Sequence, residues 1–186
     1  MARGAVESPA MTSPDQQSKI EVAFLELYER EIDAVFRHCY LRVYSRERAK
    51  EIAQEGFCRA WNFIAEGKEV RHLRGFVYRI VNNLIVDESR KKREESLEVL
   101  QEDGFEPSND GGMELLRQKI DAERVLVLLQ KLEEPFREVL VLRYIDGFPP
   151  KEIAHILDIT PDLVSVRLHR GKKMLREMLR NSPFFP

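Results

Sequence analysis

Apolar residues recur at intervals of three or four along most of the 186-residue chain, and this spacing limits the possible folds more than any other feature. The longest run comprises Ile20, Phe24, Leu27, Tyr28, Ile32, Val35, Cys39 and Val43. Such an interval places side chains on one face of an α-helix. No segment alternates apolar and polar residues as a half-buried strand does, so the sequence predicts an all-α fold.

The same spacing predicts two more helices in the first half of the chain. Ser45 is a suitable N-cap for a second helix with apolar residues over 49–64, which Gly67 ends. After a short basic loop, a third helix follows the apolar run over 73–85. Three amphipathic helices in succession indicate a small helical bundle.

The second half of the chain contains a helix-turn-helix pattern. A fourth helix is predicted over 120–132 and a fifth over 135–146. Residues 150–157 then form a short helix, and after a two-residue turn Thr160 with Pro161 provides a cap and first turn for a longer one. The shared core of these last two helices is expected to comprise Ile153, Ala154, Leu157, Ile159, Leu163, Val164 and Leu168.

Charge is segregated along the chain although the net charge is only −2. Residues 68–93 carry eight Lys or Arg against three acids, and residues 160–180 carry six against two. Residues 94–114 carry eight acids with no Lys or Arg, and their glycines and proline favour a flexible linker. The expected organisation is a disordered extension over 1–18, a helical domain over 19–93, an acidic linker over 94–114, a helix-turn-helix domain over 115–181 and a tail over 182–186.

Several functional classes lack their sequence signatures here. No apolar run approaches the roughly 18 residues of a membrane span, and the polar N-terminus has no signal-peptide core, so we expect a cytoplasmic protein. Without a glycine-rich phosphate loop, a nucleophile elbow or a His-Glu zinc spacing, we expect no enzyme and no bound metal or cofactor. Cys39 and Cys58 lie among apolar residues and are expected to be buried free thiols.

Three charged surfaces are candidates for binding partners. Glu47, Glu51 and Glu55 form an acidic ridge, which suits docking on a basic partner or a solvated face with neighbouring cations. The basic loop and third helix combine cations, amides and Tyr78, the kind of set that binds single-stranded nucleic acid. The last helix carries basic residues such as Arg167, which suit either the major groove of a duplex or solvent.

Three stretches of the chain resemble the motifs of a known family. Residues 51–61 read EIAQEGFCRAW, close to the pattern D-L-V-Q-E-T-F-L-R-A-W, and residues 76–90 read FVYRIVNNLIVDESR, with Asn83, Asp87 and Arg90 in register. Residues 147–175 read GFPPKEIAHILDITPDLVSVRLHRGKKML. In this order they resemble regions two and four of bacterial RNA polymerase sigma factors, in the extracytoplasmic-function (ECF) group of the sigma-70 family.

This resemblance implies a protein that binds core RNA polymerase and promoter DNA and catalyses no reaction itself. It also implies an anti-sigma factor that binds and inhibits the protein. Polymerase docking is assigned to Glu51, Gln54 and Glu55. Binding of the melted minus-10 strand is assigned to Lys68, Arg71, Arg74, Tyr78, Arg79, Asn82, Asn83 and Arg90. Recognition of the minus-35 duplex is assigned to Lys151, Thr160, Ser165, Arg167, Arg170 and Lys172, with Arg167 as the main base contact.

The chain departs from the family pattern at several positions. Gly56 replaces a frequent Thr at what we expect to be an exposed turn of helix, and Asp158 replaces Gly in the turn, where we expect left-handed backbone. Ser165 and Val166 stand where Lys and Ser are frequent, so a different base preference is expected. The alternative is a plain helix-turn-helix regulator that binds DNA without docking on polymerase.

Overall fold

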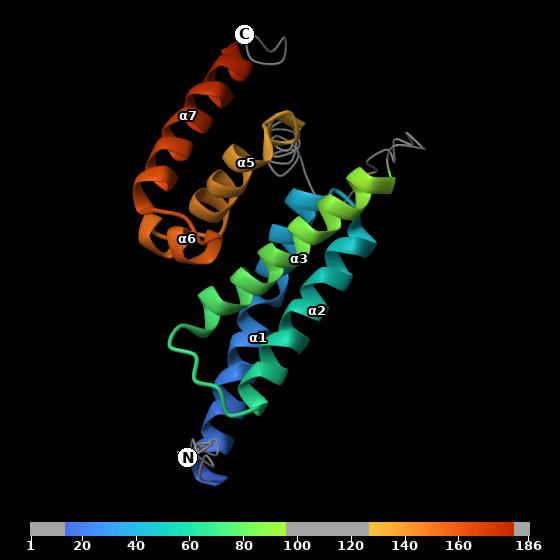
Figure 1. Cartoon of the computed structure of the whole chain (residues 1–186), viewed down its shortest axis with the longest axis vertical. Helices are drawn as coiled ribbons and strands as arrows, with labels where there is room; N and C mark the ends of the chain where they lie inside the picture. Colours follow the sequence, from blue (N-terminus) through green and yellow to red (C-terminus); the bar gives the residue numbers. More distant parts are fainter. Residues whose placement is uncertain (1–13, 96–126, 181–186) are drawn as a thin grey trace, which may run out of the picture.

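The structure, a computed structural model, describes residues 14–95 and 127–180, and every regular element within these ranges is a helix. The first group comprises α1 (Pro14–Val43), α2 (Arg46–Ala65) and α3 (Leu73–Glu95), which pack as an elongated bundle (Figure 1). The predicted all-α fold and its first bundle are therefore confirmed. Of the extension expected over 1–18, residues 14–18 are instead the beginning of α1, and the rest lies outside the described residues, as do the tail and all but the beginning of the linker. No helix within the described ranges has the length and hydropathy of a membrane span.

Short connections at capping residues set the order of the first bundle. The backbone of Ser45 is extended, and its hydroxyl accepts the N–H of Arg48 at 3.4 Å, as an N-cap does. Tyr44, with φ of 55°, turns the chain from α1 into α2 without a glycine. Gly67, with φ of 79°, takes the left-handed conformation that follows a helix end. The predicted beginning and end of the second helix are confirmed.

Aromatic and aliphatic side chains fill the space between α1, α2 and α3. The ring of Phe24 lies 6.2 Å from that of Phe57 and 5.3 Å from that of Trp61. Cys39 is fully buried in this core, and burial raises the pKa of its thiol to about 12. Cys58 is exposed, so the expectation that both thiols are buried is wrong for Cys58. It follows Phe57 directly, and a helix turns the next residue away from the core.

The second group comprises α5 (Glu134–Leu140), the π-helical turn η1 (Val141–Ile145), α6 (Pro150–Leu157) and α7 (Pro161–Arg180). Asp158 has φ of 54° between α6 and α7, and the Thr160 hydroxyl accepts the N–H of Leu163 at 3.2 Å. The predicted helix-turn-helix is confirmed. Leu163 is 39% exposed and does not belong to the shared core, because α7 turns Val164 and Leu168 inward instead. Of the fourth helix predicted over 120–132, residues 127–132 are described, and only 127–130 are helical, because residues 131–132 already turn toward α5.

The two groups of helices pack against each other. Helix α6 contacts α3, and η1 contacts α1, on one side of the first bundle (Figure 1). In the turn between η1 and α6, Phe148 is fully buried, and its ring lies 4.7 Å from the ring of Tyr78 in α3. The described helices therefore share one continuous core.

Gly56 is buried where α2 meets α3, not exposed as expected. A Cβ at this position would lie 2.4 Å from Cγ2 of Val81, so a larger residue requires Val81 or the two helices to shift. Glycine thus permits the close approach of α2 and α3. Gly75, near the beginning of α3, is different, because a Cβ there would have no neighbour within 4 Å.

Gly56→Ala is expected to lower the free energy of unfolding by about 1–3 kcal/mol, because overpacking outweighs the roughly 1 kcal/mol gained in helix propensity. Gly75→Ala, the matched control, should raise it by up to about 1 kcal/mol. Urea unfolding followed by circular dichroism measures both changes. In a double-mutant cycle, Gly56→Ala should cost less in a Val81→Ala background than in the unmodified chain. Equal stabilisation by the two glycine substitutions would show that the α2–α3 contact is not tight.

Candidate functional site

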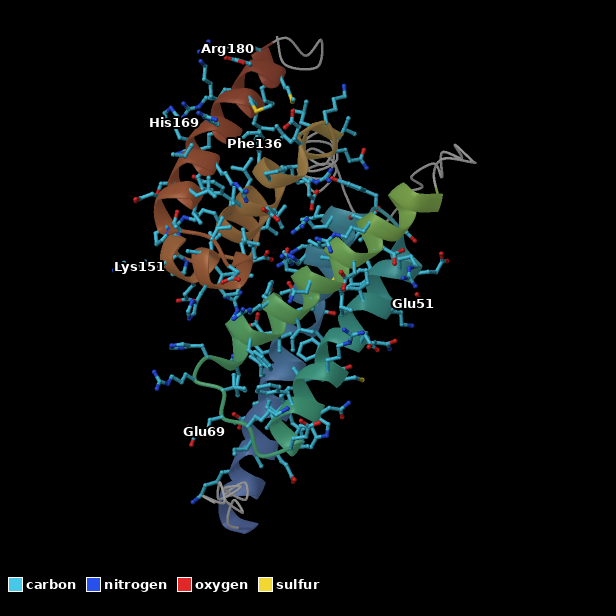
Figure 2. The ribbon with its side chains drawn as sticks, viewed as in Figure 1. Glu51, Glu69, Phe136, Lys151, His169 and Arg180 are labelled. Carbon is cyan, nitrogen blue, oxygen red and sulfur yellow. The ribbon has the colours of Figure 1, made fainter. Side chains whose placement is uncertain are left out.

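The acidic residues of α2 lie on its outer side. Glu51, Gln54 and Glu55 are exposed, and Figure 2 shows Glu51 on the side of the molecule away from α6 and α7. Glu51 pairs with Arg48, and Glu55 accepts a 2.7 Å bond from Arg59. These cations relieve the repulsion between successive glutamates, so the ridge is stable as a solvated face and still accessible to a partner.

A groove of about 520 Å³ lies between α2 and α3, beside the ridge. Its apolar lining is Ile52 and Leu84. Its charged lining comprises the four carboxylates of Glu51, Glu55, Asp87 and Glu88 and the three guanidinium groups of Arg48, Arg59 and Arg90. An apolar surface beside carboxylates suits the aliphatic stem and charged end of a lysine or arginine from a partner.

Five of the eight residues expected to bind the minus-10 strand are exposed. They are Lys68, Arg71, Arg79, Asn83 and Arg90. Beside Lys68 lies an aromatic pair that no motif in the sequence indicates, formed by Phe63 and Phe76 with ring centroids 4.8 Å apart. Both are half-buried, and the Lys68 ammonium lies 4.8 Å from the Phe63 ring centroid. Phe63 gave no signal in the sequence, because its α2 neighbours Trp61 and Ile64 already account for the apolar face.

The other three residues of that set are engaged inside the protein. Tyr78 is fully buried, and burial raises the pKa of its phenol. Asn82 is 5% exposed and accepts a 3.1 Å bond from Arg42 of α1. Arg74 donates a 2.7 Å bond to the backbone carbonyl of Asp146, just after η1. In this arrangement, all three side chains are buried by other parts of the protein or hydrogen-bonded to them.

Buried polar groups join α1 to the second group of helices. Nδ1 of His38 lies 2.7 Å from Oδ2 of Asp146, and neither side chain has any exposed surface. Arg42 pairs with Glu134 and lies 3.5 Å from Glu138, both on α5. The sequence gives no sign of these pairs, because His38 and Asp146 are 108 residues apart. Within the described ranges, no three His, Cys, Asp or Glu side chains lie close enough to hold a metal ion.

The two α5 carboxyls that face Arg42 have opposite pKa shifts. Burial acts to raise the pKa of Glu134, but the charges of Arg42 and Arg137 outweigh burial and hold the pKa below its ordinary value. Burial raises the pKa of Glu138 above its ordinary value, although Arg42 opposes the shift. Glu134 is therefore the more firmly ionised partner of Arg42.

The residues expected to bind the minus-35 duplex lie on or beside α6 and α7. Thr160, Ser165, Arg170, Lys172 and Lys151 are exposed. Figure 2 shows Lys151 and His169 on the outer side of the second group, opposite Glu51. Arg167 is only 22% exposed at its side chain, because it donates a 2.8 Å bond to Glu138. Val166 is 44% exposed beside it.

Both halves of the chain match models of known protein regions. Residues 27–95 match Sigma-70 region 2, and residues 122–175 match Sigma-70 region 4. The first match contains the acidic groove and the basic face of α3. The second contains α5, α6 and all but the last turns of α7.

Individual proteins named as sigma factors are similar to this chain. The chain is 31% identical to the ECF RNA polymerase sigma factor SigW of Bacillus subtilis, over 86% of this chain and 90% of the relative. It is 29% identical to the ECF RNA polymerase sigma factor SigE of Mycolicibacterium smegmatis, over 83% of this chain and 60% of the relative. The solved sigma factor RpoE from Bartonella quintana, in complex with the anti-sigma factor NepR, shares the fold, with a TM-score of 0.70, 20% identity, and 86% of this chain and 98% of that chain covered.

Glu134→Gln is expected to lower the free energy of unfolding at pH 7 by about 1–2 kcal/mol, because buried Arg42 loses the nearer of its two carboxylate partners. The partial exposure of Glu134 keeps the loss modest. The folded-state pKa lies below the unfolded value, so this contribution is present above the unfolded pKa. It is lost as pH falls through the folded pKa, which lies below the ordinary range of a glutamate.

Thermal unfolding at several pH values measures this difference between Glu134→Gln and the unmodified chain. Glu133→Gln, which changes an exposed neighbour, is the control and should leave the pH dependence unaltered. A stability difference for Glu134→Gln that stays undiminished at the acid end of the range would contradict the pairing with Arg42.

Proposed function

The chain belongs to the sigma-70 family of RNA polymerase sigma factors, and we propose that three of its surfaces share the work of promoter-specific initiation. Helix α2 docks on core RNA polymerase, α3 and its preceding loop bind the melted minus-10 strand, and α7 reads the minus-35 duplex. The observation that carries this assignment is the placement of Glu51 and His169 on opposite sides of the chain (Figure 2). One molecule therefore has room for polymerase and promoter at the same time.

Docking on polymerase rests on the groove between α2 and α3. A basic coiled coil in the largest polymerase subunit would place lysines and arginines against Glu51, Glu55 and the other groove carboxylates. Arg48 and Arg59 now pair with these glutamates, so docking exchanges internal ion pairs for pairs with the partner. Such complementarity sets the register and rate of association more than its strength.

Binding of the minus-10 strand rests on cations and aromatic rings around the loop before α3. Of the five exposed residues of this set, Lys68 and Arg71 provide positive charge in the loop before α3, and Arg79, Asn83 and Arg90 provide charge and an amide along one side of α3. The Phe63–Phe76 pair provides partly accessible rings on which an unstacked base can lie. A base turned out of the duplex into a pocket at this end is the expected consequence.

Reading of the minus-35 element rests on the geometry of α6 and α7. In a helix-turn-helix the N-terminal part of the second helix enters the major groove, and its basic flank neutralises phosphates. Arg170 and Lys172 are exposed for the second task. Arg167 performs the first task only after it leaves Glu138, since arginine contacts guanine through two N–H donors.

Three further expectations complete the proposal. The protein acts in the cytoplasm, it catalyses no reaction of its own, and an anti-sigma factor regulates it. Relatives named as sigma factors support the first two expectations, and the sigma–anti-sigma complex with RpoE supports the third. The plain helix-turn-helix regulator is disfavoured, because residues 27–95 match Sigma-70 region 2.

Transcription in vitro with sigma-free core polymerase on genomic fragments tests the proposed function. Starts that require this protein and share two upstream elements are the expected result. Glu51→Arg with Glu55→Arg should weaken binding to core polymerase tenfold or more, since like charges then face the basic partner. Glu26→Arg with Glu29→Arg, on the exposed side of α1, is the matched control and should bind as before.

The same charge reversals separate the proposal from its alternative. Under the plain-regulator reading, the α2 variant would keep both its DNA binding and its effect on transcription. Binding to core polymerase that survives the α2 reversal would refute docking through the groove.

Arg167→Ala is expected to weaken binding to the minus-35 duplex by about 1–3 kcal/mol and to relax preference at one base pair. Lys172→Ala should weaken all duplexes alike and reduce the salt dependence by about one phosphate contact. Competition binding with single-base variants of the duplex measures both effects. A uniform loss across sequences for Arg167→Ala would assign Arg167 to phosphate contact only.

A further inference from the structure

Helix α7 presents an apolar residue at the centre of its outer side. Val164, Leu168 and Gly171 are buried and define the inward side of the helix. Successive residues of an α-helix are about 100° apart, so Val166 points almost directly away from that inward side. Val166 is 44% exposed, and Figure 2 shows His169, three residues later, on the outer side of the second group. The residue most fully turned toward a partner of α7 is therefore a valine.

The polar residues on either side of Val166 are engaged with the protein itself. The Ser165 hydroxyl donates to the carbonyl of Pro161 at 3.0 Å, and Arg167 donates to Glu138 of α5 at 2.8 Å. Val166 needs no such release, because its side chain carries neither a donor nor an acceptor. In the first half of α7 the group that is ready for contact is therefore a pair of methyl groups.

A second apolar side chain and a basic flank accompany Val166. Leu163, one turn earlier, is 39% exposed. Arg170, Lys172 and Lys173 are exposed farther along the helix. This combination suits a partner with phosphates at its edges and an apolar group between them. The major groove of DNA provides such a group at thymine, whose 5-methyl lies on the base edge.

We propose that Val166, with Leu163 beside it, packs against the 5-methyl group of a thymine in the minus-35 element. The inference rests on the proposed function, in which α7 lies in the major groove. Serine is frequent at this position in the family pattern, so the contact is a property of this particular chain. A base with hydrogen in place of the methyl group leaves a gap beside Val166 and loses the contact.

Replacement of thymine by uracil tests the contact, since the two bases differ only in the 5-methyl group. The protein is assembled with core polymerase, and the probes are promoter fragments from a start mapped by the transcription experiment. Competition binding compares fragments in which each thymine of the upstream element, on either strand, is replaced by uracil in turn. At one such thymine, uracil should weaken binding about three- to fourfold, the value of one buried methyl group. Val166→Ser should remove that difference.

Two further variants serve as controls. Val22→Ser, the same change at a residue of α1 that is 53% exposed, should keep the full preference for thymine over uracil. Lys172→Ala should weaken binding to every fragment and still keep the preference, because a phosphate contact does not sense the base. Valine and serine have similar helix propensities, and Val166 is exposed, so Val166→Ser is expected to fold as the unmodified chain does.

The outcomes separate this inference from the proposed function. An upstream element in which no thymine is sensitive to uracil overturns the inference. A sensitivity that Val166→Ser leaves unchanged also overturns it, since the methyl group then acts through DNA shape or another side chain. The proposed function fails in a different way, namely if the unmodified chain supports no starts with core polymerase.

Discussion

Arg42 and His38 of α1 are buried away from water. Their polar partners lie in the second group of helices, so these pairs hold the two groups together. The partners come from α5 and from Asp146 after η1, so neither group satisfies these side chains alone. Separation exposes them to water, which compensates for much of the lost pairing. An interface of paired charges therefore favours one arrangement of the two groups, yet its closed and open states differ little in free energy. An interface buried only by apolar surface would lack this balance.

Local signals in the sequence were sufficient for the caps of α2 and α7 and for the turn between α6 and α7, but not for the beginning of α1 at Pro14. Ser45 and Thr160 act through residues three positions later, and Asp158 acts through its own left-handed backbone, so these caps and this turn were predicted from the local sequence alone. Gly56 and Leu163 were misjudged because the buried side of a helix depends on the helix packed against it. The spacing of three and four marks an apolar stripe but does not set its edges.

The candidate site could be only partly predicted from the sequence, again because burial depends on which elements pack together. Composition and motif identify which side chains suit DNA or polymerase, and most of them are exposed in the structure. The surroundings of Tyr78 and Arg74 depend on Phe148, about seventy residues later in the chain, and no periodicity reports such a meeting. Likewise, the bond from Arg167 to Glu138 joins two helices whose register is decided by packing.

The exposure of Cys58 has a chemical consequence of its own. With Cys39 sealed in the core and its thiol held protonated, Cys58 is the accessible thiol among the described residues. It follows Glu51, Gln54 and Glu55 on the same stripe of α2, at the three- and four-residue spacing of one helix face. An alkylating or fluorescent reagent for thiols therefore marks the native protein on its acidic side alone and leaves the basic side of α7 unmodified.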